Sequence, residues 1–180
     1  MRRFQVIVLA AVMVLASATP ALASHGTKPS GMPDNLDHYV DRNNLLSNTE
    51  VAVAQGIAQL DRSQLNVTLT GSGDVEVYDG GYGDTGWDGR TSCSNKVAST
   101  WLWERKCDVF KIEYNTSVTA HYSDFKLRVI GCHEFGHTGG LGERTAANDD
   151  PSTVISCMRD SGFLSTVLDS HDLNVINSWY

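Results

Sequence analysis

Two histidines and a glutamate stand close together in the stretch GCHEFGHTGGLGER, residues 131–144. His133 and His137 are four positions apart, so on a helix both imidazoles leave the same face and their nitrogens can meet one metal ion. Glu134 lies one position beyond His133, where its carboxylate can reach a water on that ion without binding the ion itself. The spacing therefore predicts a metal site in which Glu134 is the general base.

Zinc suits this set of donors, because neutral imidazoles leave the ion enough positive charge to lower the pKa of its water to about 7. Glu134 can take the proton as the water attacks a carbonyl group and pass it to the departing amine. A catalytic zinc site has three protein ligands and one open position. A left-handed turn at Gly140 would swing the chain back, so we expect Glu143 to be the third ligand. Asp149, Asp150 or a water is the alternative at that place.

The stretch HEFGHTGGLGE resembles the H-E-x-x-H-x-x-G-x-x-H/D signature of the metzincin zinc peptidases, and HEFGH followed by GLG is closest to the matrixin branch. The stretch SCM, residues 156–158, falls where metzincins place a tight turn under the metal, which implies that Met158 is the Met-turn residue. LDSHDLNVINSWY resembles the last matrixin helix, and YGDTGWDG resembles bacterial secreted members. The likeness covers most of residues 47–180 and implies one catalytic zinc ion and endopeptidase activity. Glu143 departs from it, because the family carries histidine or aspartate there.

The resemblance also implies how a substrate would bind. An extended peptide would lie antiparallel to an edge strand of the sheet and form backbone hydrogen bonds along its length. We expect that strand to contain KIEYN, residues 111–115. The segment between Met158 and Asp169 would form the wall of the pocket for the residue after the scissile bond.

Two other features of matrixins, a histidine-rich second zinc site and a pro-segment whose cysteine blocks the ion, have no counterpart here. The remaining histidines form no matching cluster and are expected to be surface or core residues: His25, His38, His121 and His171. Residues 24–46 contain no cysteine, so we expect no cysteine switch.

Two other functions compete with the zinc endopeptidase. The chain could be a non-catalytic metal-binding or protein-binding module on a degenerate peptidase fold, with Glu143 as the sign of decay. The intact Glu134 argues against this, because a module without activity has no chemical need for the base. A deformylase-like amidase also uses H-E-x-x-H, but such enzymes work inside cells and take a cysteine ligand from upstream.

The first residues have the pattern of a secretory signal peptide. Two arginines follow Met1, an apolar run covers residues 4–16, and ALA at residues 21–23 supplies an A-x-A cleavage site. We therefore expect residues 1–23 to be removed and the product to be secreted. Cleavage would leave 157 of the 180 residues, which is enough for one domain with a hydrophobic core.

The product would be acidic. Loss of Arg2 and Arg3 leaves 12 basic and 21 acidic side chains, a net charge of −9 with neutral histidines. Such a surface does not attract nucleic acids or anionic membranes, and no later apolar run reaches the roughly 18 residues of a spanning helix. We therefore expect neither partner, and a monomer that binds a protein or peptide substrate.

Four cysteines follow the signal peptide, and in an exported chain an even number indicates disulfides. Three pairings are possible, of which we favour Cys93 with Cys107 and Cys132 with Cys157. The second would tie the histidine helix to a downstream turn. Alternatively Cys132, next to His133, would bind the metal as a thiolate, although an exported thiol tends to oxidise.

The candidate metal ligands and general base must be positioned by helices. Ser47 and Glu50 match an S-x-x-E capping box, which predicts a helix of about 13 residues from that point. A second helix is expected from about residue 124 through the histidines to the glycine pair at residues 139–140. A third is expected to begin near residue 169.

Strands are expected where apolar and polar residues alternate, at residues 65–69, from residue 75, and at residues 110–114. Residues 24–46 are polar and indicate a loosely ordered N-terminal arm. These elements predict an α+β domain over residues 47–180. The resemblance implies a metzincin-like catalytic domain with a twisted mixed sheet, an antiparallel edge strand, and N-terminal, active-site and C-terminal helices.

Residues 79–90, DGGYGDTGWDGR, contain five glycines and three aspartates and are expected to form a loop with a buried Trp87. Aspartate oxygens suit calcium, but the spacing does not fit the 12-residue calcium loop and no glutamate closes it. The aspartates alone suggest calcium as a second metal, but their spacing does not support it.

Overall fold

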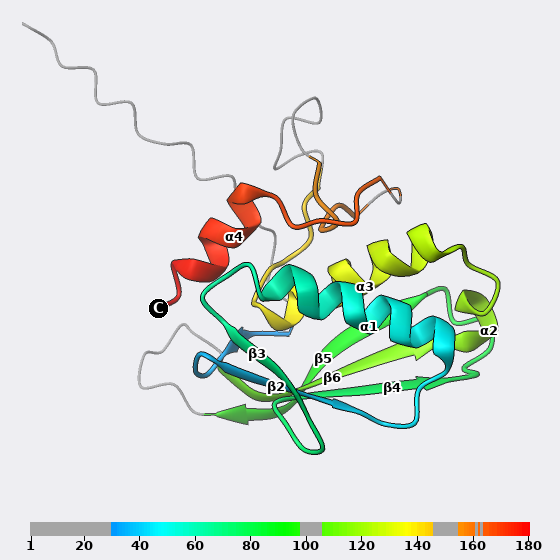
Figure 1. The fold of residues 1–180 in the computed structure, drawn as a ribbon, viewed down its shortest axis with the longest axis horizontal. Coiled ribbons are helices and arrows are strands. Elements are labelled where there is room, and N and C mark those ends of the chain that lie inside the picture. Colours follow the sequence, from blue (N-terminus) through cyan, green and yellow to red (C-terminus); the bar gives the residue numbers. More distant parts are fainter. Residues whose placement is uncertain (1–29, 98–105, 146–154, 161, 163) are drawn as a thin grey trace, which may run out of the picture.

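Helices cover one face of a six-stranded, mostly parallel sheet in an α+β fold (Figure 1). The computed structural model describes residues 30–97, 106–145, 155–160, 162 and 164–180. The strands are β1 (Met32–Pro33), β2 (Asp37–Arg42), β3 (Asn66–Thr70), β4 (Val75–Gly80), β5 (Gly89–Val97) and β6 (Lys106–Asn115). The helices are α1 (Ser47–Leu60), α2 (Thr116–Thr119), α3 (Asp124–Thr138) and α4 (Ser170–Asn177).

The strand order is β1-β6-β4-β2-β3, and β5 pairs with β6. All neighbouring pairs are parallel except the last, because β5 runs antiparallel to β6. The expected mixed sheet with an antiparallel strand is therefore present. The expectation that KIEYN forms the edge is wrong, since this stretch belongs to β6, which lies between β4 and β5.

Burial explains why the edge strand was misassigned. The last residues of β6 are almost all buried, so its apolar alternation is visible in the sequence. Residues of β5 are half-buried or exposed throughout, so this strand carries few apolar side chains. The sequence predicts a loop up to Arg90, whereas β5 begins at Gly89.

The expected N-terminal arm is wrong for residues 32–33 and 37–42, which form β1 and β2. Strand β2 lies between β4 and β3, and its side chains alternate between solvent and core, with His38 and Val40 fully buried. The alternation is present in DHYVDR, but one of the two buried residues is a histidine and charged residues flank the pair, so the apolar pattern is weak.

Helices α1 and α3 pack side by side on the sheet (Figure 1). Their backbones approach closely, because a Cβ atom on Gly131 of α3 would collide with the backbone of Ala52 in α1, and one on Gly56 would collide with Phe135. At the end of α3, Gly139 leaves room for Leu60 of α1, and for Ile176 of α4, whose side chain lies 3.0 Å from the position of a Cβ. The two helices and the sheet enclose the main hydrophobic core.

The helix ends agree with the sequence in two of three cases. Helix α3 is capped by Ser123, and α4 by a reciprocal capping box between Asp169 and Asp172. The capping box predicted for α1 is wrong, since Leu46 is the N-cap residue and no side chain caps the helix. The helix still begins at Ser47, and the strands expected near residues 65 and 75 are confirmed as β3 and β4.

The three aspartates of the glycine-rich loop do not converge on a common point. Asp79 accepts a hydrogen bond from the backbone N–H of Leu46 (2.8 Å), and Asp88 accepts one from the hydroxyl of Tyr122 (2.8 Å). Asp84 is exposed. The side-chain amide of Asn115 organises the loop instead, because it donates to the Gly83 carbonyl at 2.8 Å.

Trp87 is half-exposed and not buried as we expected. Its ring lies against Tyr82 with 5.1 Å between the centroids, and the guanidinium of Arg90 sits 4.6 Å above it. In the described ranges, no helix is long and apolar enough to cross a membrane. The expected signal peptide, residues 1–23, lies outside the described residues.

Candidate metal centre

The side chains of His133, His137 and Glu143 come together as the sequence predicted. The Nε2 atoms of the two histidines are 3.1 Å apart, and Oε1 of Glu143 lies 3.3 Å from the first and 3.4 Å from the second. Ligands at 2.0–2.1 Å from a tetrahedral ion are about 3.3 Å from one another, so the three atoms have the spacing of one face of such a site. Among the residues that the structure describes, this is the one group of three or more His, Cys, Asp or Glu donors close enough to share an ion.

The second nitrogen of each imidazole fixes its orientation. Nδ1 of His133 donates to the carbonyl of Cys157 at 2.8 Å, and Nδ1 of His137 donates to that of Leu141 at 2.9 Å. In the neutral rings both Nε2 atoms therefore present lone pairs toward the carboxylate of Glu143. Oε2 of Glu143 is buried with no hydrogen-bond partner among the described residues. Nitrogen lone pairs and carboxylate oxygens that face one another would repel unless a cation lies between them, so this arrangement suits a bound cation.

Charge at the site also favours a cation. Burial lowers the pKa of His133, but its hydrogen bond to Glu143 and the charges of Glu134 and Glu143 outweigh burial and raise the pKa to about 9. Burial raises the pKa of Glu143, whereas the two imidazoles outweigh this effect and hold that pKa well below its usual value. A divalent ion would supply the positive charge that a proton otherwise provides.

The turn after α3 places the third donor. Gly139 caps the helix and Gly140 has the left-handed conformation, with φ of 83°, as expected for the glycine pair. The backbone N–H of Leu141 then bonds back to the carbonyl of Gly136 at 3.1 Å. This return brings Glu143 to the face of α3 that carries the histidines.

Glu134 is almost fully buried beside the two histidines. The hydroxyl of Thr91, on β5, lies 2.7 Å from its Oε2 and can donate to it, which holds the carboxylate toward the edge strand. A Cβ atom on Gly89 would come within 2.9 Å of both Cγ and Oε1 of Glu134, so a residue with a side chain would not fit there without moving the carboxylate. Neither Thr91 nor Gly89 was singled out from the sequence, because their pairing with α3 depends on the unpredicted strand β5.

Met158 lies fully buried in a turn beneath the metal-site helix. A Cβ atom on Gly136 would collide with its sulfur, so this glycine, between Glu134 and His137, permits close packing. The turn is closed by Ser156, whose hydroxyl accepts from the N–H of Met158 at 2.9 Å. Met158, the residue expected in the Met-turn, therefore contacts α3 at the helical turn that carries Glu134 and His137.

The cysteines pair as favoured, Cys93 with Cys107 and Cys132 with Cys157. The second disulfide joins α3, one residue before His133, to the turn whose Cys157 carbonyl orients that histidine. Cys132 therefore has no thiolate to offer a metal ion.

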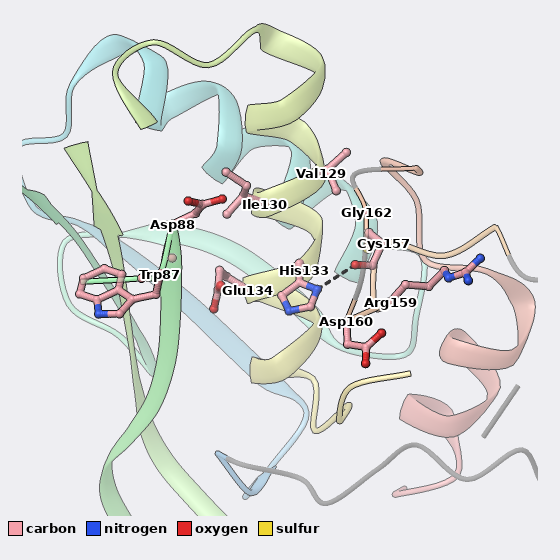
Figure 2. A pocket seen from close by; sticks show the side chains of 12 residues that line it. Trp87, Asp88, Val129, Ile130, His133, Glu134, Cys157, Arg159, Asp160 and Gly162 are labelled. Carbon is pink, nitrogen blue, oxygen red and sulfur yellow. Dashed lines mark hydrogen bonds between the residues drawn. The ribbon is translucent and has the colours of Figure 1, made fainter. Parts of the chain in front are cut away.

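A cavity of about 360 Å³ opens in front of α3 between the start of β5 and the turn after Cys157. Figure 2 shows Trp87 and Asp88 on one side of it, His133 and Glu134 on the helix, and Arg159 with Asp160 on the other side. The last two and Gly162 belong to the segment expected to form a pocket wall.

The other candidate residues are accounted for separately. His38 is a buried core residue, His121 is exposed and His171 is half-buried. His25, Asp149 and Asp150 lie outside the described residues. No protein-family model matches the chain, and a search of curated proteins finds no significant match.

Proposed function

We propose that this chain is a secreted zinc-dependent endopeptidase of the metzincin type. The observation that carries the proposal is the placement of two imidazole nitrogens and a carboxylate oxygen at the mutual spacing of zinc ligands, with the carboxylate of Glu134 beside them and an open cavity in front. Three protein ligands with space for a fourth are typical of catalytic zinc sites, whereas structural sites use four.

The residues divide the work of peptide hydrolysis. His133, His137 and Glu143 would hold the ion, which when bound would polarise the scissile carbonyl group and acidify water. Glu134 takes a proton from the attacking water and delivers it to the nitrogen of the leaving amine, so that the peptide C–N bond breaks and a carboxylate and an amine are released. Thr91 on β5 would hold the carboxylate of Glu134, a residue that lines the cavity, by a hydrogen bond.

The substrate would be an extended peptide that lies antiparallel to β5. This strand has no neighbour on its outer side among the described strands, and its first residue, Gly89, lines the cavity next to Glu134. Free backbone groups on such an edge can pair with a peptide of any sequence. The side chain after the scissile bond would then enter the cavity beside Val129 and Ile130.

Secretion rests on the signal-peptide pattern of residues 1–23 and on the two disulfides, which persist in oxidising compartments. The acidic balance of the remaining chain disfavours nucleic acid and anionic membranes as partners. A monomer that binds its substrate transiently is the assembly we propose.

The test compares Glu134→Gln with wild type. We expect one zinc ion per chain by mass spectrometry and cleavage of casein by the wild type. Glu134→Gln should keep the zinc and lose at least about 100-fold in cleavage rate, because a general base contributes roughly 10²–10⁴-fold. Glu50→Gln, which removes an exposed carboxylate paired with Arg42, is the matched control and should change neither quantity. Full activity of Glu134→Gln would refute the mechanism, and zinc binding with no peptidase activity in the wild type would favour a non-catalytic binding module.

A further inference from the structure

Arg144, the residue after Glu143, is a buried charge that the catalytic proposal does not use. Only 4% of it is exposed, and its Nη1 atom lies 2.6 Å from Oδ2 of Asp169 and 3.0 Å from Oδ1 of Asp172. Asp172 is fully buried and also accepts from the hydroxyl of Ser156. One guanidinium therefore joins the chain that follows α3 to the start of α4 and to the turn that contains Met158.

The backbone of Arg144 is fixed as well. Its N–H donates to the carbonyl of Met158 at 2.8 Å, and its carbonyl accepts from the N–H of Asp160 at 3.2 Å. These bonds form a short parallel bridge between Arg144 and Arg159. The residue next to Glu143 is thus held on both sides by the turn at residues 156–160.

The same turn reaches a second donor of the metal site. Cys157 lies between Ser156 and Met158, and its carbonyl orients the imidazole of His133. The ion cluster around Arg144 is therefore connected to Glu143 through the chain and to His133 through one hydrogen bond.

A buried ion pair does not stabilise a fold by itself, because the cost of removing the charges from water rivals their attraction. A glutamate side chain also has more rotamers than a histidine or an aspartate, so more conformational freedom must be lost when it binds an ion. If the backbone directly after Glu143 is already fixed, metal binding costs less conformational entropy.

We propose that Arg144 is a positioning residue that sets the metal affinity of this site by fixing the backbone of Glu143 and the turn that orients His133. The inference rests on the proposed metal-binding function. It assigns a role in the metal site to a residue that touches neither the ion nor the substrate.

The experiment measures zinc affinity of the full chain by competition with a chromophoric chelator, and folding by circular dichroism of the metal-free protein. Arg144→Gln should bind zinc about 10–100-fold more weakly, the range for groups that support metal ligands, while its circular dichroism spectrum stays that of wild type. Arg144→Lys keeps the charge but replaces the planar guanidinium by a compact ammonium, and its zinc affinity should lie between those of wild type and Arg144→Gln. Arg62→Gln is the control, since Arg62 also ties the approach to α4, through the Leu168 carbonyl, but has no connection to a ligand.

A purely structural role for Arg144 is separated from a positioning role by two further measurements. The absorption spectrum of bound cobalt reports ligand geometry and should change in Arg144→Gln but not in Arg62→Gln. In a double-mutant cycle, Arg144→Gln should have a much smaller effect on zinc affinity when Glu143 is already alanine. Should Arg144→Gln fail to fold, Ser156→Ala replaces it, and several-fold weaker zinc binding with a wild-type fold is expected.

Equal zinc affinity of wild type and Arg144→Gln, or additive effects of the two substitutions, would overturn the inference and leave the proposed function intact. If Ser156→Ala is the variant used, unchanged zinc affinity has the same meaning. Absence of zinc binding in the wild type would instead refute the proposed function on which the inference depends.

Discussion

At the residue scale, Glu143 is the feature that distinguishes this site from one with three imidazoles. A carboxylate donates more charge to an ion than a neutral imidazole, and its oxygen binds zinc at a similar distance. A left-handed glycine precedes Glu143 in the chain, and the buried, ion-paired residue Arg144 follows it.

Removal of Glu143 tests whether it is a ligand. We expect Glu143→Ala to weaken zinc binding by more than about 100-fold, beyond the range found for supporting groups, because a direct donor is lost. Chelator competition measures the effect, and Glu50→Ala on α1 is the control. Zinc binding as tight as that of wild type would show that another donor completes the site.

Gly89 offers a way to displace the proposed general base, Glu134, without altering a proposed metal ligand. In Gly89→Ala the new Cβ would lie 2.9 Å from Cγ and Oε1 of Glu134, so the carboxylate must move. A displacement of about 1 Å can cost on the order of 100-fold in rate. We expect that loss in kcat with zinc content unchanged, measured on a peptide substrate. An unaltered kcat would mean that Glu134 is not held where the reaction needs it.

His38 links stability to pH independently of the metal site. Burial lowers its pKa from 6.5 to about 4, while Nε2 bonds to the hydroxyl of Thr138 at 2.8 Å. Below pH 6.5 the unfolded chain therefore binds a proton that the folded chain refuses, so stability falls as pH decreases and levels off below about pH 4. The shift corresponds to about 3 kcal/mol. Urea unfolding at pH 7 and pH 4.5 should show most of this loss in wild type and a smaller loss in His38→Gln.

At the element scale, the proposed metal site lies on a helix, α3, that packs closely against α1. Gly131 and Gly136 are unfavourable in a helix by roughly 1 kcal/mol each relative to alanine, yet each admits a neighbour that a side chain would exclude. The first accepts the α1 backbone and the second accepts Met158. Both glycines lie within one turn of a proposed ligand.

Gly131→Ala should therefore destabilise the protein although alanine is the better helix former. The backbone of Ala52 cannot move aside as a flexible side chain would, so we expect a net loss of about 1–3 kcal/mol in the free energy of unfolding, as for other overpacked cores. Denaturant titration measures it. Gly71→Ala is the control, because nothing lies within 4 Å of its added Cβ. A stabilised Gly131→Ala would mean that the two helices separate at little cost.

The sequence predicts these elements unevenly, for physical reasons. The metal-site helix, with its cap, histidine spacing and terminal glycines, is a local structure that short-range patterns specify. Strands β2 and β5 escaped prediction because charged or polar residues interrupt their apolar alternation. The side chains that support the site, such as Thr91 and Arg144, meet it only through contacts that are distant in the sequence, and no spacing rule reveals them.

At the scale of the whole molecule, the two disulfides close loops in different regions. Cys93–Cys107 joins β5 to β6 across a sequence separation of 14, and Cys132–Cys157 joins α3 to the Met158 turn across 25. Loop closure predicts similar stabilisation for both, about 3 kcal/mol for the first and about 3.5 kcal/mol for the second. Their effects on stability alone would therefore not tell them apart.

Their effects on metal binding should differ. Replacing Cys132 and Cys157 together by alanine releases the turn whose carbonyl orients His133, so zinc affinity should fall several-fold beyond any general loss of stability. Replacing Cys93 and Cys107 by alanine should lower the free energy of unfolding by a comparable amount and leave zinc affinity unchanged, because this pair touches no ligand. Chelator competition and denaturant titration on both variants provide the comparison. Equal losses of zinc affinity in the two would mean that overall stability, and not the local tie beside the helix, governs how firmly the ion is held.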